Sequence, residues 1–388
     1  MPRPAPPPKL GPMKYPASLL ARTLSFCLMT SALPGLAFAA EAPMNGRYLY
    51  VATPGIRDYL DYGGHGVLIY DIDHGHRLVR RLASSGFNDK GKPVNVKGIC
   101  ASAVTGRLYV SNIKSLVCFD LRTGAILWEK EYEGGCDRMS ITPDGRIIYL
   151  PTFEKDDWHV VDALDGRVLA TISPKSGAHN TIIRADGREA YLTGLKSRLL
   201  TVADVATHTA VRTVGPFSNA IRPFTINGAG TRVYVNVNNL LGFEIGDLVT
   251  GKVLGQVKVA GFEPGAVKRH GCPSHGIALT PDEKELWLAD GHNHRIHIFD
   301  LTGPAPRQSG GVALRDMPGW ITFSLDGRLA YPSSGDVVDV RTRLVVATLQ
   351  DENGAPVQSE KLLEVDFKDG QPVRAGNQFA LGEVQSPE

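Results

Sequence analysis

Polar residues suited to chemistry recur at one position of a repeated sequence pattern. Asp137, His179, Arg222 and His275 each stand five residues before the position at which a short apolar run gives way to a turn. Two imidazoles with a carboxylate could hold a divalent metal ion, whereas imidazoles with an arginine could grip an oxyanion. Because these residues occupy equivalent positions of four consecutive repeats, we expect them to meet at one point of the fold.

Two further repeats extend this candidate site. At the equivalent position they carry Gly98 and Gly319, and the neighbouring Lys97 and Trp320 add a charge and an aromatic ring. Polar groups that converge in a narrow funnel are typical of a ligand site. The alternative is a channel that is polar only because it is filled with water. We predict a ligand-binding set of Lys97, Asp137, Arg138, His179, Arg222, His275 and Trp320.

Histidines are densest between His270 and His297, which invites a metal hypothesis. His270 and His292 fall on predicted loops and could complete a site started by the first group. The candidate metal ligands are therefore Asp137, His179, His270, His275 and His292. The sequence leaves the cofactor unknown, with a divalent metal as one possibility.

The elements that position these residues are given by an internal repeat of about 40 residues. Its first mark is an aromatic–aliphatic pair, found at Tyr50-Val51, Tyr109-Val110, Tyr149-Leu150, Tyr191-Leu192, Tyr234-Val235, Trp287-Leu288 and Tyr331-Pro332. Its second mark is a trailing aspartate, found at Asp71, Asp120, Asp162, Asp204, Asp247, Asp300 and Asp339. Short runs rich in Val, Ile and Tyr between Asp, Gly and Pro turns predict antiparallel strands. We predict an all-β, seven-bladed β-propeller of four-stranded blades, in which the aspartates cap turns.

The two ends of the repeat region suggest how the ring closes. The first repeat lacks an innermost strand, and a surplus segment at 361–367 looks like one. Pairing this C-terminal strand with blade one would remove two exposed sheet edges. We therefore expect one propeller over 44–374 and a disordered tail over 375–388.

The start of the chain predicts export. A basic, Pro-rich leader precedes an uncharged stretch and the small-x-small sequence Ala37-Phe38-Ala39, so residues 1–39 are predicted to be a signal peptide, with Met13 a possible true start. We expect a periplasmic or secreted protein with no integral membrane segment. Lys and Arg number 42 and Asp and Glu 40, a balance that argues against a nucleic-acid partner. We expect a monomer. Cys100 and Cys118 fall on strands too far apart for a disulfide bridge, whereas Cys136 and Cys272 fall on predicted loops and could pair only if the ring brings them together.

The repeat units carry a family resemblance. The chain resembles the YVTN-repeat propellers of the YncE and surface-layer type over nearly all of its length after the leader, most closely at 140–150 (SITPDGRIIYL), 162–171 (DALDGRVLAT) and 232–236 (RVYVN). Residues 288–300 (LADGHNHRIHIFD) are similar to the NHL repeat, which implies that Asn293 and His294 form a turn. Related propeller families include adhesins, lactonases, lyases and oxidoreductase subunits, so the resemblance implies the fold and leaves the chemistry open.

One segment is similar to a cofactor-binding propeller class. Residues 120–128 (DLRTGAILW) resemble the tryptophan-docking repeat of pyrroloquinoline-quinone dehydrogenases. The other repeats carry Ala170, Arg212, Gly255 and Ala347 in that region instead of tryptophan. We therefore expect no quinone cofactor.

Three interruptions of the repeat, at 54–66, 84–96 and 260–274, are predicted to enlarge loops on one face of the ring. Elaborated loops on a rigid scaffold commonly form binding sites. The first hypothesis is an exported propeller that binds a small ligand, a polymer or a protein partner at this channel mouth. The alternative is a lactonase- or lyase-like enzyme, with or without a metal ion, in which His179 or His275 is the base and Arg222 stabilises developing charge.

Overall fold

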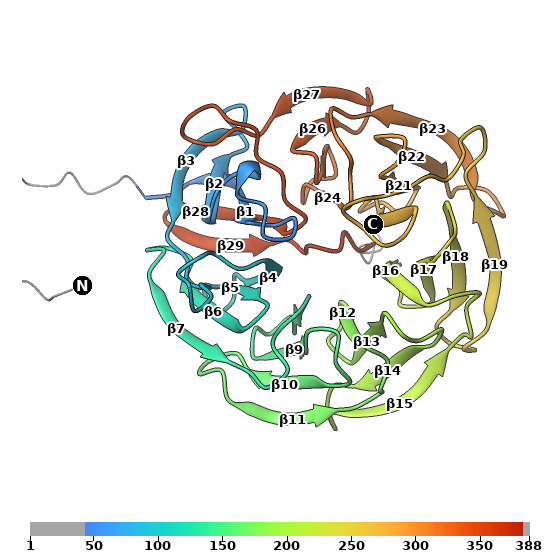
Figure 1. Ribbon diagram of the computed structural model, residues 1–388, viewed down its shortest axis with the longest axis horizontal. Coiled ribbons are helices and arrows are strands. Elements are labelled where there is room, and N and C mark those ends of the chain that lie inside the picture. The colour runs from blue at the N-terminus through green and yellow to red at the C-terminus, as the bar shows by residue number, and fades with distance from the viewer. Residues whose placement is uncertain (1–42, 383–388) are drawn as a thin grey trace, which may run out of the picture. The chain divides into compact units, whose positions relative to one another are not determined.

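Seven antiparallel sheets are arranged in a ring around a central channel (Figure 1). The computed structural model describes residues 43–382, and within that range the chain forms 29 β-strands and one short 3-10 helix, η1 (Leu60–Tyr62). The predicted all-β, seven-bladed propeller is thus confirmed. The predicted signal peptide, residues 1–39, lies outside the described residues. No helix in the described range is long and apolar enough to cross a membrane.

Blades two to four run from the innermost strand outward in chain order. Blade two consists of β4 (Val96–Ser102), β5 (Arg107–Asn112), β6 (Ser115–Asp120) and β7 (Ile126–Glu131). Blade three consists of β8 (Ser140–Ile141), β9 (Ile147–Pro151), β10 (Trp158–Asp162) and β11 (Val168–Ile172). Blade four consists of β12 (Ala178–Ile183), β13 (Glu189–Gly194), β14 (Leu200–Asp204) and β15 (Thr209–Val214).

Blades five to seven repeat the same order. Blade five consists of β16 (Ile221–Ile226), β17 (Arg232–Val237), β18 (Gly242–Asp247) and β19 (Val253–Lys258). Blade six consists of β20 (Ser274–Leu279), β21 (Glu285–Asp290), β22 (Arg295–Asp300) and β23 (Arg307–Ala313). Blade seven consists of β24 (Ile321–Phe323), β25 (Leu329–Pro332), β26 (Asp336–Asp339) and β27 (Leu344–Thr348).

Blade one is built from both ends of the described chain. β28 (Leu362–Lys368) pairs with β1 (Gly46–Thr53), and the sheet continues through β2 (Gly66–Asp71) and β3 (Arg77–Leu82). Figure 1 shows the red C-terminal strands beside the blue β1. This is the predicted ring closure. A fifth strand, β29 (Gln371–Ala375), is added on the inner side of β28.

The two marks of the repeat have separate structural roles. The repeated tyrosines lie between blades, where Tyr109 donates a hydrogen bond to the carbonyl oxygen of Ala163 in the next blade, at 2.8 Å. The repeated aspartates accept backbone amides of their own turns, as Asp120 Oδ1 does from Arg122 and Thr123, both at 2.9 Å. An aromatic ring thus fills each gap between sheets, while the carboxylate satisfies amides that the turn leaves unbonded.

Residues 376–382, expected to belong to a disordered tail, instead enter the central channel. Gln378 accepts a hydrogen bond from the amide of Ile99 at 3.3 Å and donates one to the carbonyl oxygen of Met139 at 3.0 Å. Phe379 is 1% exposed and packs against Trp320, with ring centroids 5.7 Å apart. The prediction failed here because a segment of a few residues has no period that would reveal its burial. The last six residues, 383–388, lie outside the described range.

All four described cysteines, Cys100, Cys118, Cys136 and Cys272, are buried and free. Cys100 and Cys118 lie opposite Tyr109 on the two strands that flank it, as the predicted strand order requires. The absence of a disulfide between them follows from the intervening strand.

Candidate functional site

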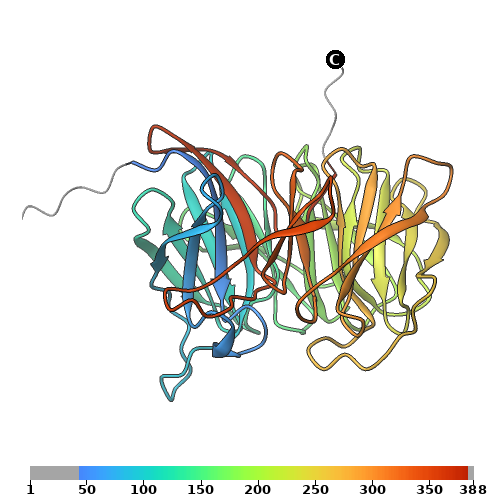
Figure 2. The same cartoon turned by 90° about the horizontal axis from the view of Figure 1, so that it is seen from above.

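The three long loops meet on one face of the ring. In Figure 2 they extend from the lower side, opposite the side on which the described chain ends. Arg269 of the 260–274 loop donates to the hydroxyl of Tyr62 at 2.6 Å, and the amide of Val96 donates to the carbonyl oxygen of Pro54 at 3.0 Å. His65 contacts the carbonyl oxygen of Ser85 at 3.3 Å. Loops from three places in the sequence therefore form one rim.

A cavity of about 380 Å³ lies inside this rim, at the mouth of the central channel. Its basic lining residues are Arg57, Lys97, Arg138, Arg222, Arg269 and Lys361, and its acidic ones are Glu154 and Glu360. His179, His270 and His275 also line it. The balance of six basic against two acidic side chains favours an anionic occupant.

Asp137 and His179 form a buried pair at the side of this cavity. His179 Nδ1 lies 2.7 Å from Asp137 Oδ2. Because a carboxylate only accepts hydrogen bonds, Nδ1 carries the proton and Nε2 keeps its lone pair. Burial lowers the pKa of His179 by more than the attraction of Asp137 raises it, so the imidazole is neutral near pH 7. A neutral imidazole oriented by a carboxylate can accept a proton.

Lys97 completes this side of the cavity. Its ammonium lies 3.3 Å from Asp137 Oδ1 and above the ring of Phe153, at 4.7 Å from the ring centroid. Burial would raise the pKa of Asp137, but its interaction with His179 and the charge of Lys97 outweigh that effect and keep the pKa below its usual value. Asp137 therefore stays ionised and holds both neighbours in place.

Glu360 forms the centre of a second charged group. Its Oε2 accepts hydrogen bonds from Arg138 at 2.6 Å and from Lys361 at 2.9 Å, while its Oε1 lies 3.0 Å from His270 Nδ1. All four side chains are buried. Burial opposes the ionised carboxylate, but the nearby charges of Lys361 and Arg138, together with the interaction with His270, hold the pKa of Glu360 well below its usual range.

The buried lysine of this group is electrostatically unusual. Lys361 Nζ donates to Glu360 and to the carbonyl oxygen of Gly55, at 2.7 Å. Burial is the main cause that lowers the pKa of Lys361 to about 7, and Arg138 adds to the effect. This ammonium therefore releases its proton near neutral pH, unlike an exposed lysine.

Arg222 is a partly buried cation of the cavity whose hydrogen bonds go only to neutral groups. Its Nε donates to Asn238 at 2.6 Å, and its Nη2 reaches the carbonyl oxygen of Gly271 at 3.4 Å. Among residues 43–382 it has no acidic partner. A guanidinium held in place without a counter-charge is suited to bind an oxyanion.

The structure brings most of the predicted site residues together. Lys97, Arg138, His179, Arg222 and His275 line the cavity, and Asp137 is buried behind His179 and Lys97. Their alignment by repeat position therefore corresponds to proximity in space.

Two predicted residues lie elsewhere. Trp320 does not line the cavity. Instead, the guanidinium carbon of Arg138 lies 3.7 Å from the centroid of the Trp320 ring, so the ring packs against the guanidinium. His292 is exposed beside Gly265 and is not part of the histidine group that lines the cavity. His270 does line the cavity, where its ring stacks on that of His275.

Sequence reasoning missed five charged residues of this cavity, namely Arg57, Glu154, Arg269, Glu360 and Lys361. Glu360 and Lys361 stand immediately before the closing strand β28, and Arg269 lies in an irregular loop. None of them occupies a repeat position, so register could not align them. The one available signal was the predicted pairing of 361–367 with blade one, which places the preceding residues at the channel mouth.

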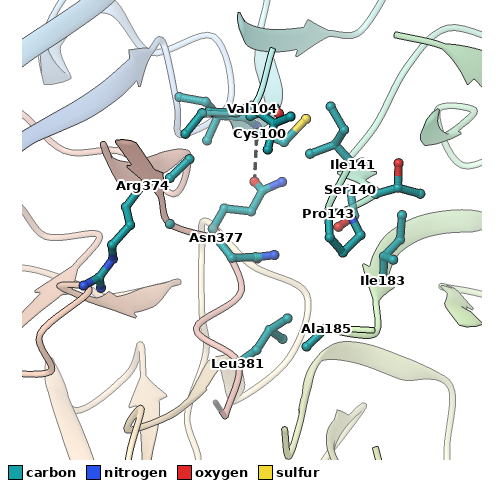
Figure 3. Close-up of a pocket in the computed structure, with 18 of the residues that line it drawn as sticks. Cys100, Val104, Ser140, Ile141, Pro143, Ile183, Ala185, Arg374, Asn377 and Leu381 are labelled. Carbon is teal, nitrogen blue, oxygen red and sulfur yellow. Dashed lines mark hydrogen bonds between the residues drawn. The ribbon is translucent and has the colours of Figure 1, made fainter. Parts of the chain in front are cut away.

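A second cavity, of about 360 Å³, lies at the other end of the innermost strands. Figure 3 shows it between the C-terminal residues Asn377 and Leu381 and the wall formed by Ser140, Ile141 and Pro143. Burial raises the pKa of Cys100, so its thiol stays protonated there. None of the predicted site residues lines this cavity.

Comparisons with known proteins support only the repeat. Residues 275–299 match the NHL repeat, a range that overlaps residues 288–300, where similarity to that repeat was expected. A chain of Kuenenia stuttgartiensis hydrazine synthase is similar with 16% identity and a TM-score of 0.44, over 69% of this chain and 100% of that chain. No curated protein matches the chain. The protein is thus a seven-bladed β-propeller with an NHL repeat.

Proposed function

We propose that the channel mouth binds a small organic anion, such as a carboxylate or a phosphate ester. The observation that carries this proposal is Arg222, which lines a predominantly basic cavity and has no acidic partner in the described chain. Lys97 and Arg138 add positive charge from two neighbouring blades, while Asp137 and Glu360 fix their positions. Charged hydrogen bonds from pre-positioned donors contribute about 1.5–3 kcal/mol each to binding.

The size of the cavity favours a small ligand over a polymer or a protein. A volume of about 380 Å³ falls at the lower end of the usual range for small-molecule sites. Long loops also surround the opening, so a bound molecule would be largely enclosed. A folded partner protein could contact the rim but not the buried charges.

The test is a thermal shift screen of the full chain against acetate, succinate, citrate and inorganic phosphate at low ionic strength. Ligand at 100 times its Kd stabilises the folded state by about 2.7 kcal/mol, which gives a readily measured rise in Tm. The expected result is a rise with at least one of these anions that is lost in Arg222→Ala. An equal rise in wild type and Arg222→Ala would contradict the proposal.

A second candidate function is enzymatic cleavage of a lactone or a similar substrate, by hydrolysis or by a lyase reaction. The observation that favours it is the hydrogen bond from His179 to Asp137, which leaves the lone pair of Nε2 as a base beside cationic side chains. Arg222 or Lys97 would stabilise an oxyanion formed near that base. Loss of a general base typically slows a reaction about 10²–10⁴-fold. A screen of aliphatic lactones should therefore give hydrolysis that falls by this factor in His179→Asn.

We further propose that this is an exported propeller of the YVTN type, as its leader and repeats suggest. Its expected location is the periplasm or the medium, and its expected state is a monomer. N-terminal sequencing of protein recovered from a native host would test export. A mature chain that begins near residue 40 supports it, and an intact leader contradicts it.

A further inference from the structure

We infer that His270, His275 and Glu360 form a binding site for a transition-metal ion such as Zn²⁺ at the inner end of the channel-mouth cavity. One ligand atom from each of the three residues lies within 4.8 Å of the others, and all three side chains are buried. Two histidines and one carboxylate are a common protein ligand set for Zn²⁺ and Fe²⁺. This inference stands apart from the anion proposal, since either site could exist without the other.

The histidine nitrogens are arranged for coordination. His275 Nδ1 lies 2.7 Å from the carbonyl oxygen of Gly319, which only accepts, so Nδ1 carries the proton and Nε2 keeps a lone pair. Metal-binding histidines typically donate their second ring N–H to such an acceptor. Burial keeps this imidazole uncharged, with a pKa well below its ordinary value.

His270 has unused ligand capacity. Its Nδ1 lies 3.0 Å from Glu360 Oε1, which only accepts, so Nδ1 carries the proton and Nε2 keeps the lone pair. Its Nε2 is buried and has no hydrogen-bond partner in the described chain. A buried polar atom without a partner calls for an explanation, and an unbound ligand is one of the ordinary ones.

The carboxylate is held by its other oxygen. Arg138 and Lys361 both donate to Glu360 Oε2, which leaves Oε1 toward His270. Gly319 makes room for this group, because a Cβ at that position would come within 2.0 Å of the His270 ring and 2.6 Å of Glu360 Oε1. Three separate segments therefore converge to fix one carboxylate oxygen against two imidazoles.

The surrounding charges select the kind of metal. Arg138 and Lys361 share the single carboxylate, so the site lacks the multiple anionic oxygens that Ca²⁺ and Mg²⁺ require. Imidazole nitrogen suits Zn²⁺, Cu²⁺, Ni²⁺ and Fe²⁺. The same cations would weaken binding of any divalent ion, and open coordination positions would face the anion-binding cavity.

The experiment uses full-length protein without a histidine tag, treated with EDTA, reloaded with Zn²⁺ and dialysed before elemental analysis. Wild type is expected to retain one equivalent. His275→Ala and Glu360→Gln should bind Zn²⁺ at least about tenfold more weakly, whereas the exposed control His292→Ala should behave as wild type. Equal retention by wild type and His275→Ala would overturn the site.

Cobalt substitution of wild type covers the case in which a variant does not fold. Co²⁺ bound by two imidazoles and a carboxylate should give visible d–d absorption that Zn²⁺ displaces stoichiometrically. A wild-type protein that is folded by circular dichroism, yet takes up neither ion, contradicts the inference. Because no organic anion is needed for either readout, failure here leaves the anion proposal to its own test.

Discussion

Arg138 Nη2 lies 2.6 Å from Glu360 Oε2, although 222 residues separate the two in the chain. Arg138 stands just before the first strand of blade three, and Glu360 stands just before β28, the strand that closes the ring on blade one. The segment that closes the propeller therefore also supplies the central carboxylate of the candidate site. Assembly of the cavity and closure of the ring depend on the same stretch of chain.

Breaking this buried ion pair should destabilise the whole ring. Glu360→Gln leaves the guanidinium of Arg138 buried without a counter-charge, a change that typically costs about 3–5 kcal/mol. Urea unfolding in the presence of EDTA measures it. The matched control is Glu352→Gln, which removes a half-exposed partner of Arg81 and should cost no more than about 1 kcal/mol. Similar losses in both variants would show that the buried pair is not special.

Truncation should separate the channel segment from the rest of the tail. A chain that ends at Ala375 loses the buried Phe379 and the hydrogen bonds of Gln378, so we expect a loss of about 3–5 kcal/mol of stability and a lower Tm. A chain that ends at Gly382 keeps these contacts and should melt like the full-length protein. Indistinguishable melting of the two truncations would mean that residues 376–382 do not stabilise the fold.

Repeat register could predict the convergence of Asp137, His179, Arg222 and His275, because equivalent strands of a ring begin at equivalent points. It could not predict how deeply they are buried. Asp137 is 0%, His179 6% and His275 8% exposed, since the long loops cover the channel mouth. Alanine is therefore expected to leave Tm nearly unchanged only at the partly exposed Arg222.

Register also says nothing about residues outside the repeats. Glu360 and Lys361 enter the cavity because β28 crosses to blade one, and this pairing depends on contacts more than 300 residues apart. Trp320 was expected to face a ligand, but its ring packs against the guanidinium of Arg138 instead. The position of the Trp320 ring is decided by side-chain packing, on which strand periodicity carries no information.

Acid sensitivity should depend in part on a histidine far from the cavity. His76 packs between blades one and seven, with its Nε2 3.2 Å from the hydroxyl of Tyr331, and burial lowers its pKa from 6.5 to about 4. The unfolded chain therefore binds an extra proton between pH 6.5 and 4, so folding stability falls as pH falls through this window.

The variant His76→Gln should lack the stability that neutral His76 contributes above this pH window, which is on the order of 2 to 3 kcal/mol. Unfolding free energies of wild type and variant, measured from pH 7 to 4, should draw together as pH falls. Parallel curves over the whole range would show that His76 does not titrate as a buried group.

The interblade tyrosine contacts should each contribute a small but measurable part of the free energy of unfolding. Tyr109→Phe removes only the hydroxyl that donates to the carbonyl oxygen of Ala163 and keeps the ring between the blades. We expect a loss of about 1–2 kcal/mol in urea unfolding, the usual cost of leaving a buried acceptor unsatisfied. An unchanged midpoint would indicate that the ring alone makes the contact.

The most direct test of the candidate site is calorimetric titration of three proteins with whichever of acetate, succinate, citrate or phosphate gives the largest thermal shift. The proteins are wild type, Arg222→Ala, and Lys268→Ala, a control that removes one exposed positive charge from the same loop as Arg269 without touching the cavity. We predict that Arg222→Ala weakens binding at least about tenfold, as expected for loss of a charged hydrogen bond, with nearly unchanged Tm. Lys268→Ala should bind as wild type does. Equal weakening in both variants, or none in Arg222→Ala, would contradict an anion site at the channel mouth.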